Sequence, residues 1–244
     1  MASRDRRRLR NGIVAAGAAL CAAPVARAGD DPVRTVLFGS LDAGRSTFVA
    51  AGAKLAAERT DRDGVVALAS LGGGYRFERA PGRALAAAPM VVRTTWIAAA
   101  VVGYQIVRDW GALAAFVGPE ASVEALTGAF GTLGLPVRYG LRLHGEAWIR
   151  PSDATLATGT LILGSTRTSA YARASWGSRM WGAYLGPETV LYADATGYRK
   201  WGVGVHATDI ALGRVGLRAS IGCEGETGRR GLGAYGALAA WTPW

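Results

Sequence analysis

The chain has no stretch of about 20 residues that is apolar and free of charge, so a membrane-spanning helix is excluded. Other long helices are disfavoured, because 35 glycines are spread along the 244 residues and each costs about 1 kcal/mol in a helix interior. The glycines follow no three-residue period, which excludes collagen. Half of the residues are hydrophobic and 19% are charged, so the composition is that of a folded protein.

The positive charge is concentrated at the N-terminus. Five arginines lie within the first ten residues, the apolar stretch Gly12–Val25 follows, and Ala26-Arg27-Ala28 comes next. A basic segment, a short apolar segment and an A-x-A site are typical of a secretory signal peptide. Cleavage after Ala28 leaves residues 29–244 with a net charge of +5 instead of +10. Most of the positive charge therefore belongs to the predicted signal peptide, residues 1–28, and no nucleic-acid partner is expected.

Cysteine is scarce. Of the two cysteines, Cys21 lies within the predicted signal peptide, and Leu20 before it fits a lipoprotein site poorly. Cys223 is then the single cysteine of the mature chain, which excludes an intramolecular disulfide. An exported protein of this size must be stabilised in another way, and a closed hydrogen-bonded sheet is one.

Side chains alternate between apolar and polar with a period of two. Between Val137 and Arg150 every odd position is apolar or glycine, and the even positions carry polar residues, glycine and one tryptophan. Since successive side chains of a strand point to opposite faces, this segment is a strand with one apolar face. The same pattern occurs in Ser169–Arg179, Lys200–Thr208 and Arg214–Cys223.

These strands favour a transmembrane β-barrel over a periplasmic β-sandwich. They approach the roughly 9–11 residues that a tilted strand needs to cross a bilayer, whereas strands of soluble proteins average about 5–6. Their polar faces carry arginine and glutamate together, which suits a hydrated lumen, and the sequence ends on Trp244, an aromatic residue. The expected fold is an all-β, antiparallel, up-and-down barrel in the outer membrane of a Gram-negative cell, in contact with its lipid.

About twelve strands are expected, an even number as in bacterial single-chain barrels; ten or fourteen stay open. The longest connections, Glu78–Pro89 and Ala125–Pro136, are expected outside the cell, together with Glu224–Arg229. The predicted strands are Val33–Asp42, Arg45–Ala57, Gly64–Phe77, Met90–Val107, Gly111–Glu124, Val137–Arg150, Thr155–Gly164, Ser169–Arg179, Trp181–Ala193, Tyr198–Thr208, Gly213–Cys223 and Arg230–Trp241.

Motifs for catalysis, metals or cofactors are absent from the sequence. The two histidines, His144 and His206, lack the paired spacing of zinc sites, and neither a G-x-S-x-G elbow nor a P-loop occurs. His206 and Thr208 share a strand face, with Glu188 on the preceding strand, which would suit an outer-membrane lipid-modifying enzyme. The alternation turns His206 inward, away from lipid, so a lumen histidine in a polar network is the better interpretation. We predict no enzyme, no metal and no cofactor.

The inward faces carry a set of charged and aromatic side chains. Such a set could bind an anionic or sugar ligand, or could pair across the barrel and stiffen it; we favour pairing, because isolated buried charges are costly. Trp148 could instead stack on a sugar ring. Lumen candidates are Glu120, Arg138, Arg142, His144, Glu146, Trp148, Arg173, Glu188, His206 and Arg218. Interfacial girdle positions are expected for Trp96, Trp176, Trp181, Trp201, Trp241 and Trp244.

One short motif occurs twice, as Val117–Glu120 and as Leu185–Glu188, each an aliphatic residue followed by Gly-Pro-Glu. Proline cannot donate a hydrogen bond to a neighbouring strand, so within a sheet it belongs at a bulge or a strand end. Both prolines are expected to bend their strands and to direct the following glutamate into the lumen.

A series of short motifs resembles the cellulose biosynthesis protein BcsS family of alphaproteobacteria, over essentially the whole mature chain. In order they are Phe38–Asp42, Gly103–Gln105, Val117–Glu120, Glu146–Trp148, Tyr171–Ala174, Leu185–Glu188, Gly197–Tyr198 and Trp201–Gly204. The resemblance implies an outer-membrane barrel that accompanies cellulose synthesis, without a catalytic residue, in export, surface attachment or assembly. Cellulose and other components of the secretion machinery are the implied partners. A generic small pore or adhesion barrel is the alternative.

Overall fold

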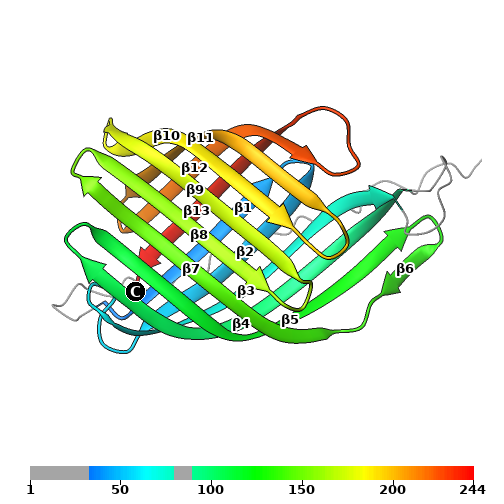
Figure 1. Ribbon diagram of the computed structural model, residues 1–244, viewed down its shortest axis with the longest axis horizontal. Coiled ribbons are helices and arrows are strands. Elements are labelled where there is room, and N and C mark those ends of the chain that lie inside the picture. The colour runs from blue at the N-terminus through cyan, green and yellow to red at the C-terminus, as the bar shows by residue number, and fades with distance from the viewer. Residues whose placement is uncertain (1–32, 80–89) are drawn as a thin grey trace, which may run out of the picture. The chain divides into compact units, whose positions relative to one another are not determined.

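In the computed structural model, antiparallel strands pair in a closed ring, which forms a β-barrel (Figure 1). The structure describes residues 33–79 and 90–244. The predicted signal peptide and most of the predicted Glu78–Pro89 loop lie outside these residues. Within them, no helix is long and apolar enough to cross a membrane.

Twelve long strands make up the barrel wall in the described residues. Each pairs with its predecessor, β5 pairs with β7, and β13 closes the ring by pairing with β1, where Trp241 lies opposite Phe38. The strands are β1 (Thr35–Ala43), β2 (Ser46–Ala56), β3 (Gly64–Arg79), β4 (Met90–Arg108), β5 (Gly111–Gly128), β7 (Arg138–Ser152), β8 (Thr155–Gly164), β9 (Ser169–Met180), β10 (Ala183–Ala193), β11 (Arg199–Leu212), β12 (Val215–Glu226) and β13 (Gly233–Pro243). Closure satisfies the backbone groups that an open sheet edge would expose to lipid.

The predicted twelve-stranded antiparallel barrel is confirmed, and the predicted bounds agree with the observed strands to within a few residues. The clearest difference lies in the predicted Ala125–Pro136 loop. There β5 continues to Gly128, and the short strand β6 (Gly131–Gly134) folds back on it as a hairpin. Gly131 has a φ of 123° at this turn, a conformation that glycine adopts readily.

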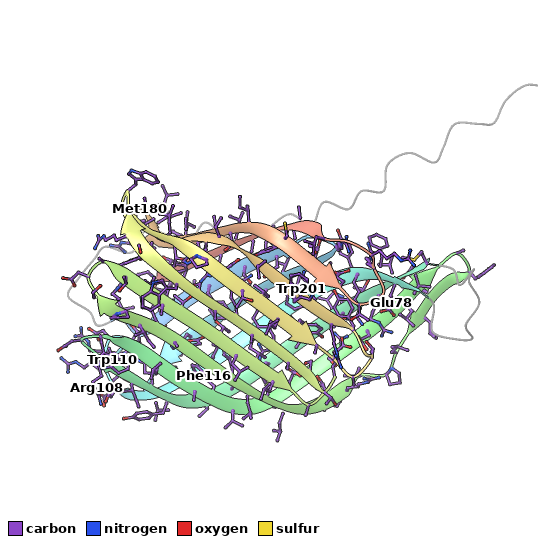
Figure 2. All side chains as sticks on the ribbon, turned by 45° about the horizontal axis from the view of Figure 1, so that its top comes forward. Glu78, Arg108, Trp110, Phe116, Met180 and Trp201 are labelled. Atoms are coloured by element: carbon purple, nitrogen blue, oxygen red, sulfur yellow. The ribbon has the colours of Figure 1, made fainter. Side chains whose placement is uncertain are left out.

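The two faces of the wall follow the predicted alternation. On β7, Leu141 and Leu143 point outward and are 62% and 51% exposed, whereas His144 points inward and is 8% exposed. On β11, Val203 and Val205 are more than half exposed. Outward side chains surround the barrel in Figure 2. The outer surface is therefore apolar, as contact with lipid requires.

The connections define two ends of the barrel, which we call the turn end and the loop end. At the turn end lie the two-residue turns 109–110, 153–154, 181–182 and 213–214 and the longer connection 57–63. There the N–H of Trp244 donates to the carbonyl of Thr35 at 2.8 Å. The connections 165–168, 194–198 and 227–232 lie at the loop end. Figure 2 shows Arg108 and Trp110 at the turn end and Glu78 at the loop end.

Outward aromatic residues form two girdles, one toward each end. On β4, Trp96 and Tyr104 are eight residues apart, which is about 26 Å along the strand and, after tilting, about 20 Å along the barrel axis. This spacing is close to the roughly 25 Å apolar band of outer-membrane barrels. Exposed aromatics toward the loop end are Tyr75, Phe77, Trp96, Tyr139 and Trp201, and toward the turn end Tyr104, Trp110, Trp176 and Trp181.

The two Gly-Pro-Glu motifs have the same structure. At Pro119 and Pro187 the register with the preceding strand is interrupted, since proline has no N–H to donate. A Cβ on the preceding glycine would lie 2.4 Å or less from a backbone oxygen of that strand, at both Gly118 and Gly186. Only glycine permits this approach.

Candidate functional site in the barrel lumen

The structure places all but one of the lumen candidates inside the barrel. Inward-facing are Glu120, Arg142, His144, Glu146, Trp148, Arg173, Glu188, His206 and Arg218. Arg138 begins β7, which extends beyond the end of β8, because pairing between these strands starts only at Arg142. The Arg138 side chain is therefore exposed at the loop end instead of lying within the lumen.

Charged side chains near the middle of the lumen pair between strands that are not neighbours in the sheet. Arg218 donates to Glu188 at 2.6 Å and to Thr158 at 2.9 Å, and the hydroxyl of Tyr235 donates to Glu188 at 2.8 Å. Glu188 is buried, and these partners offset the cost of burying its charge.

Two further ion pairs cross the lumen, one ending on β7 and the other on β9. Lys54 of β2 lies 3.1 Å from Glu146 of β7, whose other carboxylate oxygen is 3.3 Å from the ring of His144. Arg173 of β9 pairs with Asp42 of β1. These contacts have the arrangement expected of a stiffened barrel.

His206 takes part in a polar contact on its own strand. Its Nδ1 lies 2.7 Å from the hydroxyl oxygen of Thr208, and both side chains are buried. Glu188 is engaged by Arg218 and Tyr235 instead. The geometry thus favours a lumen histidine in a polar network over a histidine paired with an acid for catalysis.

At the loop end, six charges of alternating sign form a closed ring, which we call the charge ring. Each arginine contacts two carboxylates and each carboxylate contacts two arginines, at N···O distances from 2.7 to 3.3 Å. In order round the ring the members are Arg76, Glu78, Arg93, Glu124, Arg167 and Asp194. Three positive and three negative charges leave the ring neutral. Because its members come from different strands and connections, their contacts brace the lumen at this end.

The charge ring was missed by the sequence analysis. Four members lie on β3, β4 and β5, where Arg76 and Glu78 do alternate with Tyr75 and Phe77, and that alternation could have revealed them. The neighbouring glycines and alanines obscured the pattern. The remaining two members, Arg167 and Asp194, lie in connections that carry no strand periodicity.

The connection 165–168 folds inward and completes the loop end. Thr166 and Arg167 are only 7% and 6% exposed, and Thr166 donates a hydrogen bond to Glu120. The N–H of Ala195 donates to the carbonyl of Arg167 at 3.1 Å, which ties this connection to the one after β10.

The Asp194 carboxylate is held ionised by its neighbours. Burial alone would raise its pKa, but hydrogen bonds from Thr196 and from Arg76 outweigh burial, so the pKa of Asp194 lies below its ordinary value. The Asp194 carboxylate is therefore ionised at neutral pH.

At the turn end the lumen is crossed by an aromatic contact. The rings of Trp148 and Trp241 have centroids 5.7 Å apart and planes at 74° to each other. Their strands, β7 and β13, are six strands apart in both directions round the ring. The prediction that Trp241 lies in a girdle is therefore wrong: Tyr235 and Ala237, which alternate with outward residues on β13, are buried inside, and Trp241 shares their face.

The described residues hold no group of three or more histidine, cysteine or carboxylate side chains suited to a metal ion. What the lumen offers chemically is a set of ion pairs, the charge ring at one end and an aromatic contact at the other.

Comparison with known proteins finds a matching family and similar solved structures. The family model described as cellulose biosynthesis protein BcsS matches residues 36–244. The beta domain of the Bordetella autotransporter BrkA is 14% identical, with 88% of this chain and 100% of that chain covered and a TM-score of 0.49. The translocator domain of the autotransporter NalP from Neisseria meningitidis is 12% identical, with 86% and 87% covered and a TM-score of 0.44. Among curated proteins, none matches the chain.

Proposed function

Because the chain belongs to the cellulose biosynthesis protein BcsS family, we propose that it is a non-enzymatic outer-membrane component of bacterial cellulose production. The match spans residues 36–244, which is nearly the whole barrel, and agrees with the resemblance of the sequence motifs. The barrel itself is therefore the part of the chain that serves this role.

The outer-membrane location is supported by the surface of the barrel. Its outward residues are apolar between two aromatic girdles about 20 Å apart, close to the band expected for this membrane. The predicted signal peptide would deliver the chain there. Since outer-membrane barrels have short periplasmic turns and longer outer loops, the turn end faces the periplasm and the loop end faces outward.

The contacts across the lumen favour a role at the surfaces of the barrel over a role as a conduit. Arg76 and Asp194 meet from opposite walls at the loop end, and Trp148 and Trp241 meet at the turn end. A glucan could pass only after these contacts separate, and a buried charge that loses its partner is costly. We therefore assign the protein to attachment of cellulose at the cell surface or to assembly of the secretion machinery.

Deletion of the gene tests this role. Cellulose retained by washed cells should fall, while cellulose synthase activity in isolated inner membranes stays unchanged, because an outer-membrane barrel does not reach the cytoplasmic sugar nucleotide. Normal surface cellulose in the deletion strain would favour the alternative, a generic small barrel. A steady conductance of the purified protein in planar bilayers would favour a pore.

A further inference from the structure

The turn end of the lumen holds two indole rings, those of Trp148 and Trp241. Trp148 and Trp241 are both partly exposed there, whereas the middle of the lumen is lined by ion pairs such as Arg218 with Glu188. An indole has a flat apolar face and one polar N–H, a combination suited to ligands that have an apolar face and polar, hydrated edges.

The wall is shaped to receive Trp241. A Cβ on Gly216 of β12 would lie 2.4 Å from the indole of Trp241, so the ring can rest on this part of the wall only because residue 216 is glycine. The ring of Trp148 stands at 74° to it. Both rings are partly exposed, so a flat ligand that enters from the mouth can stack on the part of either ring that the other does not cover.

Polar groups stand beside the two rings at the mouth of the barrel. Arg150 and Asp209 reach each other across the mouth at 3.4 Å, with side chains 45% and 40% exposed, and the Arg150 guanidinium carbon is 6.0 Å from the centre of the Trp148 ring. Asp209 occupies a bulge between Thr208 and Ile210 and has a φ of 66°. A non-glycine residue in this strained conformation is a recurrent feature of functional sites.

We propose that this mouth binds glucose units of a β-1,4-linked glucan from the periplasm. In such a glucan every hydroxyl is equatorial, so each ring presents apolar C–H faces for stacking and a polar edge for hydrogen bonds. The two indoles fit the faces, and Arg150 and Asp209 supply a donor and an acceptor for the edge. One positive and one negative charge suit a neutral sugar better than an anionic one. The choice of glucan rests on the proposed role in cellulose production.

Calorimetric titration of the full-length barrel in detergent with cellohexaose tests the site. We expect saturable binding that weakens at least tenfold in Trp148→Ala and in Trp241→Ala, and by less in Asp209→Asn. Trp176→Ala, which removes an outward tryptophan near the same end, is the matched control and should bind as the parent does. Maltohexaose, which has α-1,4 links and a curved shape, should not compete.

A heat-dependent shift in gel mobility shows which variants fold; Trp148→Phe and Trp241→Phe replace any alanine variant that does not, with the same order of effect expected. The inference is overturned if the parent does not bind cellohexaose, or if Trp176→Ala weakens binding as much as the lumen variants. The deletion phenotype is separate: loss of surface cellulose without cellohexaose binding would leave the proposed function standing and remove this site.

Discussion

Arg76 Nη1 and Asp194 Oδ2 lie 2.9 Å apart, although Arg76 is on β3 and Asp194 directly follows β10, which is six strands from β3 in both directions round the barrel. This ion pair spans the lumen between opposite walls, and the Asp194 side chain is completely buried. With Trp148 and Trp241 meeting at the other end, the barrel is braced at both mouths. The predictions below test this bracing, the backbone that carries it and the surface that it leaves for cellulose.

Removal of both braces should open the barrel. The combined variant Asp194→Ala, Trp148→Ala, Trp241→Ala removes the pair that spans the loop end and clears the turn end, and we expect a steady conductance in planar bilayers. Asp194→Ala alone should conduct little, because the aromatic contact still crosses the turn end. Arg138→Ala, which removes an exposed arginine at the loop end, is the control and should be silent. A silent triple variant that folds would show that other side chains block the lumen.

The charge ring should make stability depend on acid. The pKa of Asp194 is depressed in the folded protein, so its contribution is complete above the unfolded value of about 4 and is lost as the pH falls through the folded pKa. Melting of the heat-modifiable form should therefore shift to lower temperature below about pH 4. In Asp194→Asn that acid-dependent loss should be smaller and the stability at neutral pH lower. Asp153→Asn, in an exposed turn, should behave as the parent does.

The outward and inward faces should respond differently to charge. Leu143 is 51% exposed and lies four residues from the girdle residue Tyr139, about half the distance between the girdles, so Leu143→Arg should destabilise the inserted barrel by about 2–4 kcal/mol. Arg142→Leu, one residue away, should be milder, because Thr166 still donates to Glu120. Equal losses in urea unfolding from lipid vesicles would contradict the assignment of faces.

The glycines of the Gly-Pro-Glu motifs should be needed for close strand packing. A Cβ at residue 186 would lie 2.0 Å from the carbonyl oxygen of Trp176, and both backbones must move to relieve it. Gly186→Ala should therefore cost about 1–3 kcal/mol. Gly64→Ala, where a Cβ meets nothing within 4 Å, should be close to neutral in the same melting assay. Comparable melting temperatures for the two variants would contradict the close approach.

The sequence predicts those features that depend on residues close together in the chain. The strand over Val137–Arg150 follows from alternation within one segment, and both Gly-Pro-Glu motifs follow from the chemistry of proline. The ion pair of Arg76 with Asp194 joins residues 118 positions apart, and Asp194 lies in a connection without periodicity. Trp241 shares a face with Tyr235 and Ala237, but the alanines and glycines of β13 hide this alternation in the sequence. The contact of Trp241 with Trp148, like the ion pair, is set by closure of the barrel, which no local pattern reveals.

The β5–β6 hairpin supplies an outer surface for the proposed attachment role. It continues β5 beyond Val123, which pairs with the girdle residue Trp96, and it carries two apolar side chains in water: Phe130 is fully exposed and Leu133 is 61% exposed. We take these two side chains as the contact that the proposed attachment role would use. Phe130→Ser with Leu133→Ser should leave the barrel assembled and reduce the cellulose retained by washed cells, with more cellulose released to the medium. Thr132→Ser, on the same hairpin, is the control. Unchanged retention in the double variant would move the attachment role to another surface, and the turn end with Trp148 would then be the next to test.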